Sequence, residues 1–291
     1  MSKDINDNLV NLMELIDEEE AILFDKISEN ILSYGVTAIP YLEATSEKSL
    51  DEIVQLRVKY LIGKIRVQGL YGELHNWATM HSNDLLKGYF IVSKYLFPSL
   101  DVEHVMSKVE ALKKQVWLEL KKEMTPFEEA TVISKVFYEV RKFTLVSDVR
   151  SMPDCLCLNA LLNSNKAHPL THSLLYAGIA QRLGIPIYGV QLPESIFLSY
   201  VDSYDPLSPD FKSDVKFYLQ PFMAGMFLSN EQHLELLEKE HPDNVELFDG
   251  ACSNQNFLAQ VLSKMYMFFI DAKKKEKSED MILLIEALLS S

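Results

Sequence analysis

The sequence is poor in cysteine, glycine and basic residues. Only three cysteines occur among 291 residues, an odd number that argues against the disulfide framework of a small secreted protein. Glycine numbers ten, and no glycine-rich loop of the kind that cradles phosphate is present, so we predict no nucleotide site. The 42 acidic residues outnumber the 28 basic ones and give a formal net charge of −14. Such a surface repels phosphates and anionic lipid head groups, and we expect neither nucleic acid nor membrane as a partner.

Long apolar runs are also missing from the chain. The longest, Met265 to Ile270, is far too short to cross a bilayer. The first seven residues lack the charged-then-apolar pattern of a secretory signal. Together with the few cysteines, these features favour a cytoplasmic protein. The hydrophobic content of 48% is ample for one large domain or for two to three smaller ones.

The central stretch of the chain predicts a buried helix followed by a meander of strands. Pro169 stands where a helix would begin, since the first turn loses nothing by its missing N–H. Gly184 and Pro186 are the matching stop signals. Apolar residues at helical spacing cover so wide a face that we expect this helix in a core: Leu170, Leu174, Leu175, Ala177, Ile179 and Leu183. Three short β-prone runs follow, at 187–192, 196–201 and 215–219.

Helices are predicted on both sides of this core. Residues 5–69 show the periodicity of two or three short helices. The phrase from Gly35 to Leu42 resembles the middle of a HEAT-type helical repeat, and a lone unit of that type would act as a packed cap. Thr125 to Glu128, with Pro126 at the first helical position, forms a capping box that opens a helix through about Lys142.

Three motifs, in order and at suitable separations, resemble the SirB1 family. This family is the bacterial branch of the papain-like thiol-enzyme superfamily and carries a transglutaminase-like domain. The motifs fall on His168 to Pro186, on Gly189 to Ile196 and on Gln220 to Ser229. The resemblance implies an α+β protein in which a buried helix packs against a small antiparallel sheet.

The resemblance also implies a division of the chain into four parts. These are a HEAT-like helical region at 1–82, a helical lead-in at 83–148, a degraded transglutaminase-like core at 149–230, and C-terminal helices at 231–291 that look like a truncated tetratricopeptide array.

The same alignment implies that the catalytic residues are replaced. Pro169 stands at the position of the family's nucleophilic cysteine, Ser195 at that of its histidine and Gln220 at that of its aspartate. Proline has no nucleophile, serine is no base near neutral pH, and glutamine cannot offset an imidazolium charge. We therefore expect a pseudoenzyme without a cofactor, whose groove between these three positions binds a protein or peptide partner.

Two alternatives retain chemistry in the same region. Cys155 or Cys157, or the hydroxyl of Thr171, could serve as a relocated nucleophile with His168 or His172 as its base, which would make an amidohydrolase or protease-like enzyme. Alternatively, the two cysteines and two histidines would suit a tetrahedral zinc ion, because histidines four residues apart share a helix face.

Overall fold

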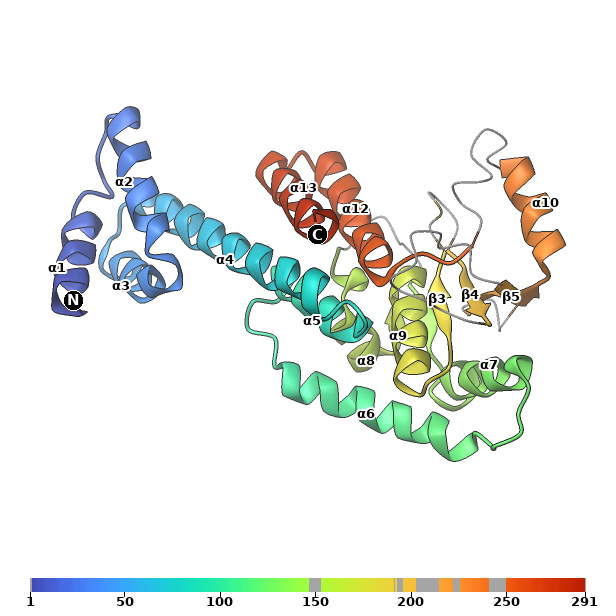
Figure 1. Ribbon diagram of the computed structural model, residues 1–291. Coiled ribbons are helices and arrows are strands. Elements are labelled where there is room, and N and C mark those ends of the chain that lie inside the picture. Colours follow the sequence, from blue (N-terminus) through green and yellow to red (C-terminus); the bar gives the residue numbers. More distant parts are fainter. Residues whose placement is uncertain are drawn as a thin grey trace. The chain divides into compact units, whose positions relative to one another are not determined.

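The computed structural model describes residues 2–146, 153–190, 192, 196–202, 215–221, 226–240 and 250–290 (Figure 1). The chain divides into two compact units, Met1–Glu73 and Leu74–Ser291. Helix α4 (Glu52–Met80) belongs to both, since the division falls inside it. Over the described ranges, no helix has the length and apolar content required to span a bilayer.

The first unit is entirely helical in its described part. It contains α1 (Ser2–Met13), α2 (Ala21–Ser33), the short 3-10 helix η1 (Gly35–Ala38), α3 (Ile39–Lys48) and the part of α4 up to Glu73. Its core gathers the apolar faces of these helices: Leu9, Ile16, Ile27, Ile31, Leu42, Val54, Val58, Leu61 and Ile65. Arg57 on α4 donates to the carbonyl oxygens of Ile16 and Glu18, both at 2.7 Å, and stacks its guanidinium over the ring of Phe24. The region 5–69 is helical as predicted, but it holds parts of four α-helices rather than two or three short ones, and α4 has 29 residues.

The second unit begins with helices that carry clear capping residues. They are α5 (Leu85–Leu96), α6 (Val102–Glu119) and α7 (Pro126–Ser134), capped by the side chains of Asp84, Asp101 and Thr125. The capping box predicted between Thr125 and Glu128 is confirmed, because each side chain bonds the other's backbone N–H. The helix was predicted through Lys142, but its α-helical part ends at Ser134. A π-helix, η2 (Lys135–Val140), continues it.

The sheet has four antiparallel strands in the order β3-β4-β5-β6. The strands are β3 (Ile187–Gly189), β4 (Leu198–Val201), β5 (Val215–Gln220) and β6 (Met226–Leu228). The three predicted β-prone runs correspond to β3, β4 and β5 and are confirmed. A separate two-residue parallel bridge joins β1 (Thr144–Leu145) to β2 (Lys166–Ala167).

The two faces of the sheet contact different helices. Tyr200 on one face donates its hydroxyl to Glu129 of α7, and Gly189 on the same face lies against Phe257 of α12 (Asn254–Asp271). Tyr218 on the other face stacks on His233 of α10 (Asn230–Glu240), with 3.6 Å between ring centroids. Helix α12 also pairs with the last helix, α13 (Lys275–Leu289).

Helix α9 (Pro169–Arg182) is the centre of the second unit. Every residue from Leu170 to Ala180 is buried, as the wide apolar face predicts. It packs against α5, α8 (Leu158–Ser164) and β3. The approach to α5 is so close that a Cβ atom on Gly178 would lie 2.5 Å from Cγ of Leu86. The predicted fold class, a buried helix against a small antiparallel sheet within an α+β protein, is confirmed.

Candidate functional site

The topology directs the end of β5 toward the end of the core where α9 begins. Gly184, with φ of +76°, lets the chain turn sharply after α9, so that β3 runs back along the helix. Gly189 of β3 pairs with Leu198 of β4, and Leu198 pairs with Leu219 of β5. Gln220, half-buried, is the last residue of β5 and therefore lies at the end of the sheet nearest the helix start. Ser195, the other predicted strand residue of the site, lies outside the described residues.

The start of α9 has no uncommitted backbone donor. Pro169 is the first helical residue and carries no N–H. His168 is the N-cap, and its Nδ1 accepts the N–H of Leu170 at 3.1 Å. The N–H groups of Thr171 and His172 both donate to the His168 carbonyl oxygen, at 2.9 and 3.3 Å. Helix starts bind anions through such N–H groups, and here proline and the cap have used them all.

The hydroxyl of Thr171 belongs to a buried hydrogen-bond network. It donates to the carbonyl oxygen of Cys155 at 2.9 Å and lies 3.0 Å from the hydroxyl of Tyr89 on α5. Tyr89 also donates to the carbonyl oxygen of Leu156, at 2.7 Å. Thr171 is fully buried, and burial holds the pKa of Tyr89 well above its usual value. This network fastens the first turn of α9 to the 3-10 helix η3 (Pro153–Leu156) and to α5.

The two cysteines near this site are buried thiols. Cys155 lies in the 3-10 helix η3, and Cys157 is the N-cap of α8. Polar groups in the tight turn fix the local backbone: the N–H of Cys157 donates to the carbonyl of Asp154, and that of His168 to the carbonyl of Cys155. Burial raises the pKa of Cys157, and a hydrogen bond with Ser93 of α5 only partly opposes this rise. The Cys157 thiol is therefore protonated near neutral pH, whereas a nucleophile must be a thiolate.

Both histidines of the site are neutral at physiological pH. Burial, together with electrostatic repulsion from Lys264 and His172, lowers the pKa of His168 from 6.5 to about 4. Burial also lowers the pKa of His172 to about 4, although its bond to the Thr144 carbonyl works in the opposite direction. Nε2 of His172 lies 3.1 Å from that carbonyl oxygen and donates to it, which leaves Nδ1 as a buried acceptor without a hydrogen bond. A thiolate–imidazolium pair would require a lowered cysteine pKa and a raised histidine pKa.

The four residues of the predicted zinc alternative do not converge. In the part of the chain that the structure describes, which includes all four, no three histidine, cysteine, aspartate or glutamate side chains are grouped as metal ligands. Nδ1 of His168 is occupied by the helix cap, and the thiol of Cys157 bonds Ser93.

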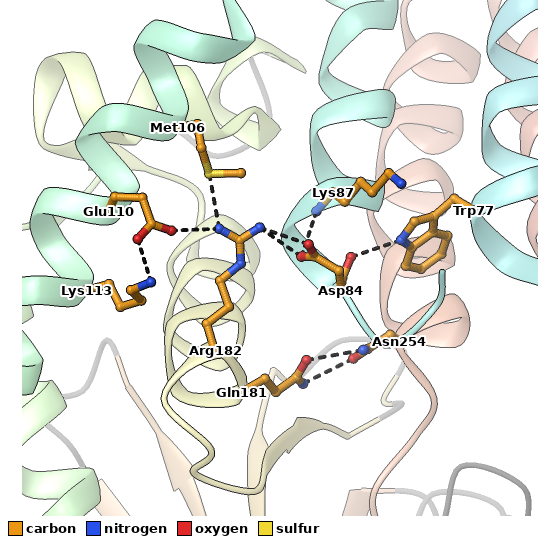
Figure 2. Close-up of polar contacts among 9 residues, drawn as sticks. All are labelled: Trp77, Asp84, Lys87, Met106, Glu110, Lys113, Gln181, Arg182 and Asn254. Carbon is orange, nitrogen blue, oxygen red and sulfur yellow. Dashed lines mark hydrogen bonds and ion pairs between the residues drawn. The ribbon is translucent and has the colours of Figure 1, made fainter. Parts of the chain in front are cut away.

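The other end of α9 carries a polar network that the sequence analysis treated only as part of a motif (Figure 2). Nη2 of Arg182 donates to both carboxylate oxygens of Asp84, each at 3.0 Å, and Nη1 donates to Glu110 of α6 at 3.1 Å. Asp84 simultaneously caps α5 by accepting the N–H of Lys87. Its carbonyl oxygen accepts the indole N–H of Trp77 at 2.9 Å. Arg182 thus ties three helices together, a role in which a planar, multidentate donor is needed.

A pair of amide side chains completes this network. Gln181 and Asn254 donate to each other at 3.1 and 3.2 Å, as Figure 2 shows. The second amide hydrogen of Gln181 goes to the Ile187 carbonyl oxygen, and that of Asn254 goes to the Ser82 carbonyl oxygen. All four amide hydrogens are used, so these two residues link α9, β3 and α12 without an unpaired donor.

These features define an α+β protein whose core is one buried helix against an antiparallel sheet, with polar clamps at both ends of the helix. The sequence profile of the Transglutaminase-like superfamily matches residues 103–266, which is more than half of the chain. The chain therefore belongs to this superfamily. The matched range contains α9, the whole sheet and most of α12. No curated protein matches the chain significantly, and neither does any solved structure.

Proposed function

We propose that this chain is a non-catalytic, SirB1-type member of the transglutaminase-like superfamily that acts as a binding or regulatory module. One observation carries the proposal. Where a thiol enzyme would present its nucleophile, α9 begins with Pro169, and the N–H groups that follow are bonded to His168.

Thiol-dependent acyl transfer needs four components at this place. They are a thiolate, a general base, a group that orients the base, and N–H donors for the oxyanion. Pro169 removes the thiol and one backbone donor together. Ser195 and Gln220 occupy the positions matched to the base and its orienting carboxylate, and neither can take over that role.

The surroundings of Thr171 and Cys157 do not support either residue as a relocated nucleophile. The hydroxyl of Thr171 already donates to a buried carbonyl, and the raised pKa of Cys157 keeps its thiol protonated. His168 is a helix cap and His172 donates to Thr144, so each ring is committed to a structural bond.

The ligand class that we propose is a peptide segment or an amide side chain. The carboxamide of Gln220 is half-buried at the end of β5 and can donate and accept, as a peptide group requires. The net charge of −14 opposes nucleic acid and anionic membranes as alternative partners.

A transamidation assay tests the absence of catalysis. The protein is incubated at neutral pH with benzyloxycarbonyl-Gln-Gly and hydroxylamine, and hydroxamate and ammonia are measured beside an active transglutaminase. We expect no product above the buffer rate. Turnover that disappears on Cys157→Ser or Thr171→Val would contradict the proposal and support the enzymatic alternative.

A titration tests the binding role. Calorimetry with the same peptide should give a measurable dissociation constant, and Gln220→Ala should weaken binding roughly fivefold through the loss of about one hydrogen bond. Gln68→Ala, at an exposed glutamine of α4, is the matched control and should bind as the parent does. No binding by the parent, or equal binding by both variants, would rule out this groove as a peptide site.

A further inference from the structure

One face of α4 in the first unit is apolar and exposed. Its opposite face, with Val54, Val58, Leu61 and Ile65, is buried in the core of that unit. Ile53, Leu56 and Tyr60 form a stripe on the outer side of the helix, with spacings of three and four residues, and Leu50 is exposed two residues before the helix begins. Leu50 is 96% exposed and Leu56 is 68% exposed. Single exposed apolar residues are ordinary, whereas a continuous stripe on one helix is typical of a protein contact surface.

The stripe is held rigidly at its beginning. Asp51 accepts the N–H of Ile53 at 2.7 Å, and its carbonyl oxygen accepts the N–H of Gln55. The side chain of Gln55 donates to the carbonyl of Ser49 at 3.0 Å. These hydrogen bonds fix the backbone at the start of α4, where the stripe begins.

Two oppositely charged side chains flank the stripe on the same edge. Glu52 precedes Ile53 and Lys59 precedes Tyr60, so the two charges are seven residues apart and lie along one side of the helix. Both are exposed. A parallel copy of the helix would not bring the two charges opposite each other.

An antiparallel second copy of α4 satisfies all of these groups at once. With a two-fold axis between residues 54 and 56, Ile53 faces Leu56 of the other copy. The same register places Glu52 opposite Lys59 on both sides of the axis. The apolar pairing and the charge pairing require the same register to within one residue, and each is repeated by symmetry, as an isologous contact demands.

We propose that this stripe is a homodimerisation surface on which α4 of one copy packs antiparallel to α4 of another. The occupant is a second copy of this chain, because apolar order and charge order are both self-complementary. The contact is small, with three apolar side chains of α4 from each copy, so the dimer is weak and reversible rather than an obligate assembly.

Sedimentation velocity of the full chain over a concentration series tests the proposal. The parent protein should pass from monomer to dimer with rising concentration. Leu56→Glu should weaken the dimer by more than about a hundredfold, since each dimer loses two apolar contacts. Leu118→Glu, at an exposed leucine of α6, is the matched control and should leave the equilibrium unchanged.

A charge exchange separates this register from any other arrangement. Glu52→Lys alone and Lys59→Glu alone should each weaken the dimer roughly tenfold, because like charges then face each other twice. The double variant should restore the parent affinity, and circular dichroism should show all variants folded. A chain that stays monomeric at every concentration, a dimer insensitive to Leu56→Glu, or a double variant as weak as the singles would overturn the proposal. If a different protein covers the stripe, this chain alone should stay monomeric at every concentration.

Discussion

His168 caps the start of α9, and this role depends on its neutral form. Its Nδ1 caps the helix by accepting the N–H of Leu170, and its ring lies among groups that disfavour a positive charge, including Lys264. Protonation would place a hydrogen on Nδ1 and remove the cap. The lowered pKa of about 4 means that the folded structure disfavours the protonated form of the ring.

The lowered pKa values of His168 and His172 predict a loss of stability in acid. Both groups have a folded pKa of about 4, below the ordinary value of 6.5, so the unfolded chain binds more protons between these limits. Their stabilising contribution is complete above pH 6.5 and is lost as the pH falls to about 4. His168→Asn keeps an acceptor for Leu170 and removes one titration. Urea unfolding at pH 7 and pH 4.5 should show a smaller loss for this variant than for the parent, and equal losses would contradict the assignment.

Removing the hydroxyl of Thr171 should lower the stability of the fold. Thr171→Val keeps the shape but leaves the carbonyl of Cys155 and the hydroxyl of Tyr89 each short of a buried partner. We expect the free energy of unfolding to fall by about 1–3 kcal/mol. Thr131→Val is the control, because that exposed hydroxyl bonds only the carbonyl four residues earlier and should cost under about 0.5 kcal/mol. A Thr171 variant as stable as the control would mean that the network carries no net stability.

Among the secondary-structure elements, glycines set the distances between neighbours. A Cβ on Gly178 would lie 2.5 Å from Leu86, so α9 and α5 touch through the glycine backbone. A Cβ on Gly88 would meet Trp77 and Leu258 at the same distance. Gly69, in contrast, has open space where a Cβ would be placed.

These distances predict opposite outcomes for the same substitution. Gly178→Ala should destabilise the second unit by about 1–3 kcal/mol through overpacking, offset in part by the better helix propensity of alanine. Gly69→Ala gains that propensity in α4 and meets nothing, so it should stabilise by up to about 1 kcal/mol. Thermal unfolding followed by circular dichroism measures both. If the two changes had the same sign, the close contact between α9 and α5 would be refuted.

Arg182 should matter more than an ordinary surface cation. Arg182→Met breaks the bonds to Asp84 and Glu110 and leaves the Asp84 carboxylate partly buried, so we expect a cost of about 1–3 kcal/mol. Lys135→Met removes an exposed pair with Glu119 at 3.7 Å and should cost less than about 1 kcal/mol. Chemical denaturation of both variants gives the comparison, in which equal costs would show that the clamp is dispensable.

The elements that were predictable are those with local signals. Proline and glycine punctuate α9 at Pro169 and Gly184, the Thr125 capping box opens α7, and alternation marks β3 to β5. The π-helix η2 carries no such signal, because it depends on packing: Phe137 meets Phe143 and Tyr176, and Tyr138 stacks on His172.

The site was predictable in composition but not in bonding. The sequence alone predicts that Pro169 opens the helix, yet the commitment of Thr171 depends on Tyr89, 82 residues away. A long separation in sequence, from Ser93 to Cys157, likewise hides the contact that engages the Cys157 thiol. The placement of Pro169, Ser195 and Gln220 as a substituted triad, and the four-part division of the chain, stay predictions.

At the scale of the whole chain, the two units differ in their content of cysteine and tryptophan, the residues that thiol labelling and fluorescence detect. All three cysteines and both tryptophans fall in Leu74–Ser291, while Met1–Glu73 contains neither residue type. The three thiols are buried, and burial raises the pKa of Cys252 to about 12. Thiol chemistry and tryptophan emission therefore both report on the second unit alone.

Thiol labelling should follow unfolding of the second unit. With a disulfide reagent at pH 7, the native protein should react far more slowly than a small free thiol. Burial protects all three cysteines, and the raised pKa values of Cys157 and Cys252 keep those two thiols protonated. In a urea series, the labelling midpoint should coincide with the midpoint of tryptophan fluorescence. Circular dichroism adds the first unit to the signal. A thiol that reacts rapidly before the fluorescence changes would reveal an accessible, activated cysteine and contradict the burial described here.

The proline at the start of α9 also bears on any attempt to install catalysis by design. Pro169 lacks both a reactive side chain and an amide hydrogen, so a cysteine at this codon would supply two ingredients at once. Under the function proposed above, two further codons would still lack a base and its orienting carboxylate, and the single replacement should therefore give no turnover.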